Sequence, residues 1–220
     1  MKQQRIILIG CGEQARVSID AIEEQGCYEI AGLVTNDEAE LNRRVYGYSV
    51  VCLDRDLKTF LDESPDVIGY FLGVGMGSGN MKRREEIYVR LDRMLPVVSV
   101  ISPESVVSRY ARLGRGVFLE AYTRIANGVT IGNHSIIQSF TSINHDQTIG
   151  ENVLVGCNVS MAGVSVGDDT IIADGSSIGF KKRVGRNCLI TDGTVVTKDI
   201  PDDVIAYGNP AKTMPRQNVS

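Results

Sequence analysis

The feature that most constrains this chain is an aliphatic residue at every sixth position over its C-terminal half. Neither an α-helix nor a single strand has a six-residue period. Hexapeptide repeats are typical of a parallel β-helix, in which each short strand directs one aliphatic side chain inward. One step, from Met161 to Val166, has five residues. The positions are Val107, Leu113, Leu119, Ile125, Ile131, Ile137, Ile143, Ile149, Val155, Met161, Val166, Ile172, Ile178, Val184, Ile190 and Val196.

Two further regularities support this prediction. Glycine directly follows seven of the aliphatic residues (Gly114, Gly132, Gly150, Gly156, Gly167, Gly179 and Gly185), and we expect it to let the chain bend at the corners. The fourth residue after most of them is small or β-branched, which suits a narrow interior: Thr123, Val129, Ser135, Thr141, Val153, Val159, Thr170, Ser176, Cys188 and Thr194. Each buried Ile or Val contributes roughly 1.5–3 kcal/mol, so these residues form a sufficient core.

The first hundred residues have a different pattern. Residues 5–9 form an aliphatic run, the glycine turn Gly10-Cys11-Gly12 follows, and Val17, Ile19 and Ile22 have helical spacing. We expect further strands at 28–34, 66–72 and 96–100, a glycine-rich segment at 73–79 and a helix at 81–90. This order of elements predicts a Rossmann-like domain.

The glycine turn has two interpretations. Gly10, Gly12 and the start of the helix could hold the phosphates of a nucleotide, or the turn could be a tight connection without a ligand. Asp37, after the second strand, could bind a ribose hydroxyl, and segment 73–79 would lie at the same sheet edge or be a flexible loop. Full NAD binding is disfavoured, because about 100 residues provide only about one mononucleotide-binding half of that fold.

Composition excludes several classes of protein. A net charge of −4 and a pI near 5.3 disfavour a protein that binds nucleic acid. The five cysteines have no CxxC spacing and, without a signal peptide, predict reduced thiols and a cytoplasmic location. No apolar run is long enough to span a membrane. Neither a zinc-type spacing nor a Ser-His-Asp or Cys-His arrangement is present, so we expect no metal and no covalent intermediate.

Together these motifs resemble one family. A small Rossmann-like domain, the hexapeptide repeat, Asn144-His145-Asp146, Asp199-Ile200-Pro201 and Gly208-Asn209-Pro210-Ala211-Lys212 are similar to the hexapeptide-repeat acetyltransferases of sugar nucleotides. These include the bacterial N-acetyltransferases of bacillosamine or perosamine type and the sialic acid O-acetyltransferases. The resemblance implies a left-handed coil, a homotrimer with active sites between subunits, acetyl-CoA as donor, and a nucleotide sugar bound by the N-terminal domain.

We therefore expect three segments: a Rossmann-like domain at 1–100, the left-handed β-helix at 101–205, and an irregular or short helical cap at 206–220. Two departures leave the nucleotide open. The turn reads Gly12-Glu13-Gln14 where the family commonly has Gly-Gly-His, and the segment after the second strand contains Asp37 where paired acidic residues are usual.

Acetyl transfer to an amine needs a general base, and histidine suits neutral pH. The chain contains two histidines. We expect His134 to be a solvated turn residue. His145 precedes Asp146, a carboxylate that can orient the imidazole, and its match to the family motif favours catalysis over the alternative of a second exposed corner. Direct attack of the acceptor amine on the thioester is the predicted mechanism.

The repeat predicts neighbours for His145. Three hexads close one coil, so Ile143 and Met161 should stack about 4.8 Å apart, placing Gly163 one rung above His145 as a backbone oxyanion donor. The corner after Ile178 would hold the phosphates of acetyl-CoA, unless it is only a charged, solvated corner. The five-residue step marks either a ligand-binding irregularity or a deletion without consequence, and Gln147 should point outward toward substrate.

The predicted sites are these. The catalytic pair is His145 and Asp146, and the residues predicted to bind acetyl-CoA are Gly163, Ser177, Lys181, Lys182 and Arg183. The residues predicted to bind the nucleotide sugar are Gly10, Gly12, Gln14, Asp37, Gly75 and Asn80. The predicted acceptor is the 4-amino group of a 4-amino-4,6-dideoxy sugar nucleotide. The alternatives are O-acetylation of a sugar hydroxyl and a non-catalytic, nucleotide-binding trimeric scaffold.

Overall fold

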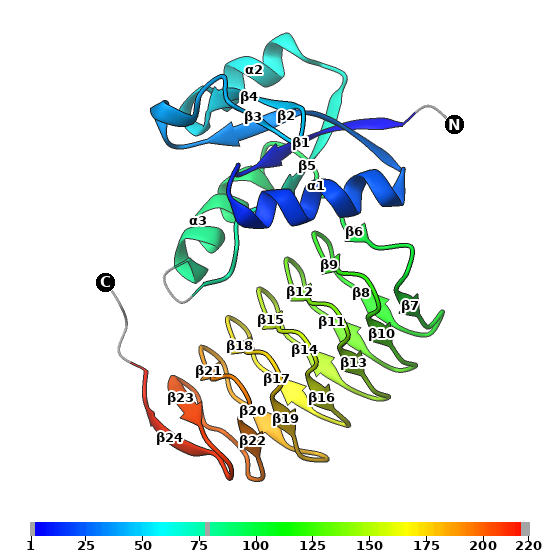
Figure 1. Cartoon of the computed structure of the whole chain (residues 1–220), viewed down its shortest axis with the longest axis vertical. Coiled ribbons are helices and arrows are strands. Elements are labelled where there is room, and N and C mark those ends of the chain that lie inside the picture. The colour runs from blue at the N-terminus through cyan, green and yellow to red at the C-terminus, as the bar shows by residue number, and fades with distance from the viewer. Residues whose placement is uncertain (1–2, 78–79, 217–220) are drawn as a thin grey trace. The chain divides into compact units, whose positions relative to one another are not determined.

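The computed structural model describes residues 3–77 and 80–216. The chain divides into two compact units, Met1–Val100 and Ile101–Ser220, which are described separately below (Figure 1). Ser78 and Gly79, part of the predicted glycine-rich segment, lie outside the described residues. Among the described residues, no helix combines the length and the hydropathy needed to cross a membrane.

The N-terminal unit is a small α/β domain. Its strands are β1 (Gln4–Ile9), β2 (Tyr28–Thr35), β3 (Arg44–Val45), β4 (Tyr48–Leu53) and β5 (Val67–Leu72). Its helices are α1 (Glu13–Gln25), α2 (Leu57–Glu63) and α3 (Met81–Leu91), with short 3₁₀ turns η1 (Glu38–Glu40) and η2 (Asp54–Asp56). The sheet order is β3-β4-β2-β1-β5, and β3 alone is antiparallel to its neighbour.

This order explains why the central strands are nearly continuous apolar runs. Helices α1 and α2 connect β1 to β2 and β4 to β5, and residues 6–9 of β1 are at most 3 % exposed. The chain leaves β1 toward β2 and returns on the other side as β5, which creates a topological switch point between β1 and β5. Ligands of such sheets bind at the carboxyl ends of the strands at the switch point.

Two details of this unit differ from the sequence prediction. The strand predicted at 96–100 is reduced to a single bridge between Val97 and Tyr70, and Val100 already belongs to the first strand of the β-helix. The hairpin of β3 and β4 and the helix α2 were not predicted. Their periodicity is weak, and the parallel pairing of β4 with β2 is a contact between distant segments.

The second unit is a left-handed parallel β-helix with three sheets. One sheet contains β7 (Val106–Val107), β10 (Arg124–Ile125), β13 (Ser142–Ile143), β16 (Ser160–Met161), β19 (Ser177–Ile178) and β22 (Val195–Val196). The next contains β8 (Arg112–Leu113), β11 (Thr130–Ile131), β14 (Thr148–Ile149), β17 (Ser165–Val166) and β20 (Arg183–Val184). The third contains β6 (Val100–Ile101), β9 (Phe118–Leu119), β12 (Ile136–Ile137), β15 (Leu154–Val155), β18 (Ile171–Ile172), β21 (Leu189–Ile190), β23 (Val204–Tyr207) and β24 (Lys212–Pro215).

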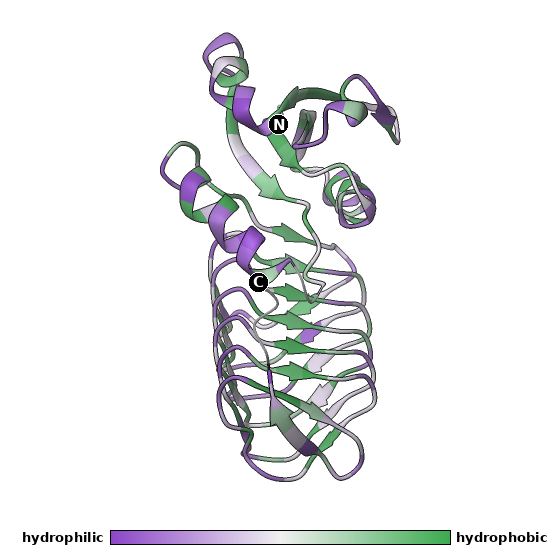
Figure 2. Cartoon of the chain, turned by 90° about the vertical axis from the view of Figure 1, so that its left-hand side faces the viewer, coloured by the Kyte–Doolittle hydropathy of each residue, from purple (hydrophilic) through white to green (hydrophobic). Residues whose placement is uncertain are grey.

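The predicted interior is confirmed. The aliphatic residues from Leu119 to Val196 form one buried cluster, and the ten small or β-branched residues predicted to line the coil are all buried. Figure 2 shows the strands of this unit mainly in the hydrophobic colour and its corners mainly in the hydrophilic one. Ile143 stacks on Met161 and Met161 on Ile178, as predicted, and the repeat begins one hexad earlier, at Ile101.

The glycines after the aliphatic residues have a different role from the one predicted. None of these seven has a positive φ; the left-handed residues lie two positions further on, as at Asn152 and Asn187. A Cβ atom at Gly150 would instead lie 2.3 Å from Asp168 Oδ1, in the coil above. These glycines are therefore required by close approach between coils and not by bending.

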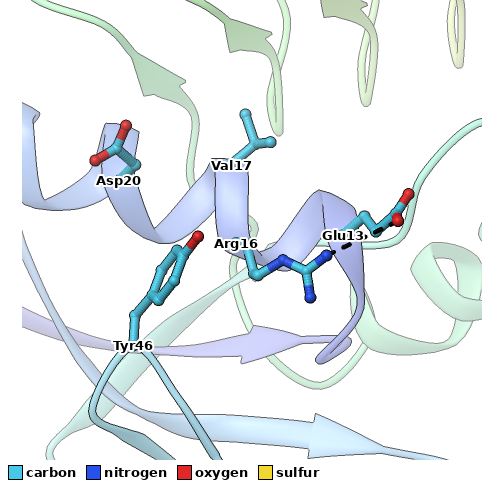
Figure 3. Close-up of a pocket in the computed structure, with 5 residues that line it drawn as sticks. All are labelled: Glu13, Arg16, Val17, Asp20 and Tyr46. Carbon is cyan, nitrogen blue, oxygen red and sulfur yellow. Dashed lines mark ion pairs between the residues drawn. The ribbon is translucent and has the colours of Figure 1, made fainter.

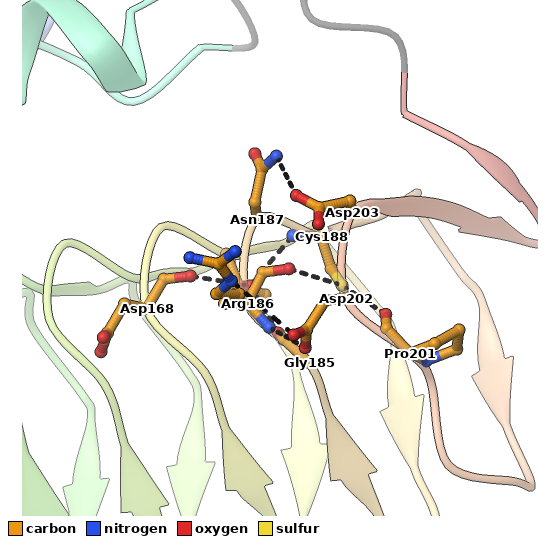
Figure 4. A network of polar contacts seen from close by, with 9 residues as sticks. Asp168, Gly185, Arg186, Asn187, Cys188, Pro201, Asp202 and Asp203 are labelled. Carbon is orange, nitrogen blue, oxygen red and sulfur yellow. Dashed lines mark hydrogen bonds and ion pairs between the residues drawn. The ribbon is translucent and has the colours of Figure 1, made fainter.

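The close approach comes from a corner contact that recurs along the coil. Asp202 Oδ1 lies over Gly185 and accepts a hydrogen bond of 3.0 Å from the Arg186 amide (Figure 4). Asn133, Asp168 and Asp174 make the same contact at other corners, with the amides of Arg115, Glu151 and Cys157. The residue two positions after the aliphatic one thus joins each coil to the coil below.

The predicted C-terminal cap is wrong in form. Instead of an irregular or helical segment, β23 continues the third sheet parallel to β21, and β24 closes it as an antiparallel hairpin. The predicted boundary between residues 205 and 206 falls inside β23, where Ala206 is fully buried. Pro201 and Gly208 suggested an end to the coil, but Val184 pairs with Ile200 and the coil continues through the proline.

Candidate functional site

His145 occupies a corner where the repeat lacks its usual contact. It is the second residue after Ile143, the position at which Asn133, Asp168, Asp174 and Asp202 join their corners to the coil below. His145 does not make that contact with the coil below. Its side chain is 58 % exposed, and its described polar contact is with Asp146. Asn127 and Phe180, at the equivalent positions of the same corner, make no such contact among the described residues either, so this corner leaves its side chains free for a ligand.

Asp146 is in contact with the imidazole of His145. Its Oδ2 lies 3.0 Å from His145 Nδ1, and its backbone is left-handed, with a φ of 55°. The Asp146 amide donates to Asn127 O at 3.1 Å, which anchors the corner on the coil below. A Cβ atom at Gly128 would lie 2.3 Å from Asp146 Oδ1, so the glycine leaves space for the carboxylate. The contact with Nδ1 leaves Nε2 as the nitrogen that can accept a proton.

The prediction for His134 is wrong. It is 2 % exposed and left-handed, with a φ of 57°, and its amide donates to Arg115 O at 2.8 Å. The equivalent positions in the coils above are Asn152, Asp169 and Asn187, so His134 belongs to a polar column along another corner. Of the two histidines, His134 is therefore buried and His145 is exposed.

Gln147 does not point outward. It is 1 % exposed, and its Nε2 donates to Asn144 O at 3.0 Å and to Met161 O at 2.8 Å. Asn144 Nδ2 donates to the same Met161 oxygen at 3.1 Å. The outward prediction assumed that a long polar side chain at an inner position must leave the prism, whereas the shortened corner above supplies a carbonyl for it.

The shortened corner also changes the register above His145. Asp146, Gly163 and Lys181 are all left-handed, and the Lys181 amide donates to Ala162 O as the Asp146 amide donates to Asn127 O. Gly163 therefore lies above Asp146, and Ala162 lies above His145. The prediction counted residues from Met161, but the five-residue step removes the position that would have kept Gly163 over His145.

The residues predicted to bind acetyl-CoA lie along the same corner, in the coils above His145. Gly163 is covered by the next corner: a Cβ atom there would lie 3.3 Å from Phe180 Cε2 and 3.4 Å from Lys181 Cγ. Lys181 and Arg183 are exposed, whereas Lys182 takes the inner position and is half-buried. Ser177 is exposed in β19, ahead of this corner. The structure thus brings these residues to one edge without making them a uniform basic cluster.

The candidate nucleotide site lies at the switch point of the N-terminal sheet. A Cβ atom at Gly10, whose φ is +109°, would lie 2.7 Å from Gly73 O, and the Gly73 amide donates to Ile9 O at 2.8 Å. The turn after β1 and the loop after β5 are therefore neighbours, as predicted from their position at the ends of parallel strands. The fold explains Gly10 fully, because any side chain there would clash with backbone.

Gly12 and Gly75 have no such structural reason. Gly12 precedes α1 with a φ of −85°, and a Cβ atom there would meet nothing within 4 Å. At Gly75 a Cβ atom would be in ordinary contact with Gln14 Cβ, at 3.6 Å. Gln14 Nε2 is buried and has no hydrogen-bond partner among the described residues. Two glycines that the fold does not need, beside an unpaired amide, suit a ligand that approaches the backbone closely.

The other two predicted residues have structural roles in the described chain. Asp37 is exposed, and its Oδ1 accepts from the Ala39 amide at 2.9 Å, which caps η1. Asn80 precedes α3, its carbonyl accepts from the Arg84 amide, and its amide donates to Gly77 O. Neither contact excludes a ligand, and a role for either residue stays a prediction.

Sequence reasoning missed Arg84. This arginine of α3 is 1 % exposed, and its Nη1 donates to Val74 O in the loop after β5. Burial lowers the pKa of Arg84 to about 10. An arginine within a helical segment is usually solvated, and only its position under the loop shows that it holds the backbone next to Gly75.

A second missed residue is Glu120, at the corner after β9. It is 8 % exposed and accepts hydrogen bonds from the Ser139 amide and hydroxyl, both at 3.2 Å. Burial and the nearby Asp174 raise the pKa of this carboxyl. Tyr122, two residues later, is exposed and stacks on Phe140 with ring centroids 5.1 Å apart. The six-residue period is defined by aliphatic residues, so it indicates neither the buried Glu120 nor the stacking of Tyr122 on Phe140.

A shallow pocket of about 410 Å³ lies elsewhere on the N-terminal unit, along α1 and next to the exposed Tyr46 (Figure 3). Glu13, Arg16, Val17, Asp20 and Tyr46 line it, and none of the six residues predicted to bind nucleotide does. Arg16 Nη2 lies 3.8 Å from Glu13 Oε1, and this exposed ion pair contributes little to stability.

Over residues 3–77 and 80–216, no three histidine, cysteine or acidic side chains gather as metal ligands.

Two family models match the chain. The PglD N-terminal domain matches residues 5–91, and the bacterial transferase hexapeptide (six repeats) matches residues 110–145. These matches define the class of protein as a hexapeptide transferase with an added N-terminal α/β domain. No curated protein matches the chain.

Solved structures give a closer comparison. Perosamine N-acetyltransferase from Caulobacter crescentus, crystallised as a histidine-to-asparagine mutant with CoA and GDP-perosamine, is 30 % identical with a TM-score of 0.86, covering 95 % of this chain and 96 % of that one. The acetyltransferase domain of PglB from Neisseria gonorrhoeae, in complex with acetyl coenzyme A, shares the fold at 22 % identity and a TM-score of 0.84, covering 97 % and 100 %. WeeI from Acinetobacter baumannii shares it at 20 % identity and 0.72, covering 96 % and 100 %.

The chain therefore belongs to the sugar-nucleotide acetyltransferases of the left-handed β-helix family, and it is an acetyltransferase.

Proposed function

We propose that the chain transfers the acetyl group of acetyl-CoA to the 4-amino group of a nucleotide-linked 4-amino-4,6-dideoxy sugar, with His145 as the general base. The observation that carries this proposal is the His145 corner. Its imidazole is exposed, held by Asp146 at 3.0 Å, and placed where the repeat elsewhere has a structural carboxylate or amide. The relative from C. crescentus, crystallised with CoA and GDP-perosamine, supports the same chemistry.

The reaction needs one proton acceptor and one oxyanion donor. The acceptor amine attacks the thioester carbonyl and loses a proton to His145 Nε2, and the thiolate of CoA leaves and is protonated. Asp146 stabilises the imidazolium that forms. Backbone amides of the shortened corner, at Ala162 or Gly163, are the candidates to stabilise the oxyanion, because their own side chains are no larger than a methyl group.

Acetyl-CoA is the co-substrate, and its contacts within this chain are part of the proposal. We assign the pantetheine arm to the corner that runs from His145 past Gly163 to Phe180. Lys181 and Arg183 provide exposed positive charge for the phosphates, and Lys182 contributes from its half-buried position. Ser177, exposed ahead of this corner, remains a predicted contact.

The N-terminal unit is assigned the nucleotide. Gly12, Gly75 and the unpaired Gln14 amide at the sheet edge support a site for phosphates and an attached group. A homotrimer is part of the proposal, and the exposed Tyr110, Tyr122, Phe140 and Phe180 support burial of the corners in an assembly. The cytoplasmic location expected from the cysteines stays a prediction.

The test has two stages. The chain is first screened by thermal shift against UDP-, GDP- and dTDP-linked sugars, and thiol release from acetyl-CoA is then followed with the 4-amino sugar nucleotide of the best-binding base. We expect one nucleotide to raise the Tm and its amino sugar to release thiol in a His145-dependent way. Nucleotide binding without thiol release from any amino sugar would favour a non-catalytic scaffold, and release with a sugar hydroxyl alone would favour O-acetylation.

A further inference from the structure

Gln147 is a buried polar residue in a column of the coil whose other buried residues are valines. The backbone hydrogen bonds from Thr130 to Gln147 and from Thr148 to Val164 place Val129, Gln147 and Val164 at the same inner position of successive coils. Val129 and Val164 are buried and apolar, and Lys182, the next residue of the column, is only half-buried. A glutamine between two valines therefore needs a reason other than the packing of the column.

The buried side chain of Gln147 leaves one polar atom without a hydrogen bond. Nε2 makes two hydrogen bonds, but Oε1 is buried and has no partner among the described residues. An unpaired buried oxygen destabilises the folded state. Thr141, an inner residue of the same coil at another corner, shows how such a position is normally satisfied. Its hydroxyl donates to Gly156 O at 2.6 Å and accepts from the Val159 amide at 3.1 Å.

The shortened corner directly above explains where the amide fits. Successive coils are offset by 18 residues at Ser142 and Ser160, and by 17 at Ser160 and Ser177. In the coil below, Ile143 O accepts a backbone amide from Ala126 at 2.9 Å. The corresponding oxygen, that of Met161, accepts the side-chain amides of Gln147 and Asn144. The long side chain and the missing residue therefore compensate each other.

Both contacts bear on the candidate active site. Asn144 O belongs to the peptide group that joins Asn144 to His145, so the bond from Gln147 fixes that peptide plane and the direction in which the imidazole leaves the backbone. Met161 O precedes Ala162 and Gly163, the backbone proposed to hold the thioester. One buried amide thus ties the base to the donor-binding corner.

We propose that Gln147 is a positioning residue, which sets His145 and the shortened corner at Ala162 and Gly163 in their relative places for acetyl transfer. The proposal rests on the proposed function and adds to it a residue that touches neither substrate. The proposal also explains the five-residue step. The short corner above His145 brings Met161 O within reach of the Gln147 amide, and it leaves room for acetyl-CoA.

The kinetic test compares Gln147→Val with Thr141→Val, which removes two buried hydrogen bonds from the same coil at another corner. We expect Gln147→Val to lower kcat at least tenfold and to weaken CoA binding, measured by calorimetry, about threefold or more. Thr141→Val should lower the Tm while kcat and CoA affinity stay within twofold. Equal losses in both variants, or a kcat within twofold for Gln147→Val, would overturn the proposal. If Gln147→Val does not fold, Gln147→Met, of nearly the same length and without donors, takes its place.

A second test does not depend on activity. Inserting one glycine after Gly163 restores a six-residue step and removes the space that the Gln147 amide uses. The insertion in wild type should lower the Tm by more than the same insertion in Gln147→Val, because the two sites are coupled. Additive changes in Tm would contradict the coupling. Absence of thiol release from wild type would count against the proposed function alone. The comparison of the insertion in wild type and in Gln147→Val would still decide whether Gln147 and the five-residue step are coupled.

Discussion

The two units of this chain form their candidate sites in opposite ways. In the N-terminal unit the site is made by omitting side chains: Gly12 and Gly75 leave backbone exposed at a sheet edge, although the fold would accept a larger residue at both. In the β-helix the site is made by placing side chains, His145 and Asp146, where other corners hold a structural Asp or Asn.

The difference teaches how far an internal repeat helps in finding function. A repeat supplies its own reference, because each corner can be compared with the others and an exception is visible. The α/β unit has no such reference, so the glycines that the fold requires cannot be told from those that it does not require until their surroundings are known. The following predictions test this contrast.

The largest expected effect separates the two histidines. His145→Ala should lower kcat for thiol release at least a hundredfold, because general-base catalysis typically contributes 10²–10⁴-fold. The Tm should stay close to that of wild type, because the side chain is exposed. His134→Asn, which keeps a residue that tolerates a positive φ, is the control and should retain kcat within a few-fold. A loss of activity in both variants to the same degree would remove the basis for assigning the base to His145.

The second effect concerns two glycines of the coil. Gly150→Ala should destabilise the β-helix by about 1–3 kcal/mol, because the new methyl group would lie 2.3 Å from Asp168 Oδ1. Gly175→Ala meets open space but must adopt a φ of +66°, so its cost should be nearer 1 kcal/mol. Urea unfolding of the two variants measures both. A larger loss at Gly175 would show that bending, and not close approach, determines where glycine is required.

A third effect, of about tenfold, tests the N-terminal site. Gly12→Ala should leave the free energy of unfolding within about 0.5 kcal/mol of wild type, because a Cβ atom there meets no neighbour. Nucleotide affinity, measured by calorimetry, should fall about tenfold, because the methyl group blocks close approach of a phosphate to the turn. Unchanged affinity would place the nucleotide away from this edge of the sheet, for example at the pocket beside Tyr46.

The smallest expected effect is a pH dependence of stability at Glu120. Burial and Asp174 raise the pKa of this carboxyl in the folded state. The stabilisation of the folded state by the protonated carboxyl is therefore fully present below its ordinary pKa of 4.5, and it is lost as the pH rises through the pKa of the folded state. Glu120→Gln should therefore gain stability relative to wild type as the pH rises from 4 to 8, by about 1 kcal/mol or less. Thermal unfolding at several pH values measures the difference. A constant difference in Tm would show that Glu120 titrates as it does in the unfolded chain.

The sequence by itself determined the β-helix, the stacking of Ile143, Met161 and Ile178, and the pairing of His145 with Asp146. These depend on spacing along the chain, and the coil converts spacing directly into position. It also placed the two glycine loops at one sheet edge, because parallel strands end together.

Only the tertiary structure decided which residues the fold itself requires. Gly10 is needed and Gly12 is not, Gln147 turns inward, Gly163 lies over Asp146, and Arg84 is buried under a loop. Each of these depends on contact between segments or coils whose separation differs from the repeat. A period in the sequence predicts regular neighbours, whereas a missing residue or a contact across the sheet changes them.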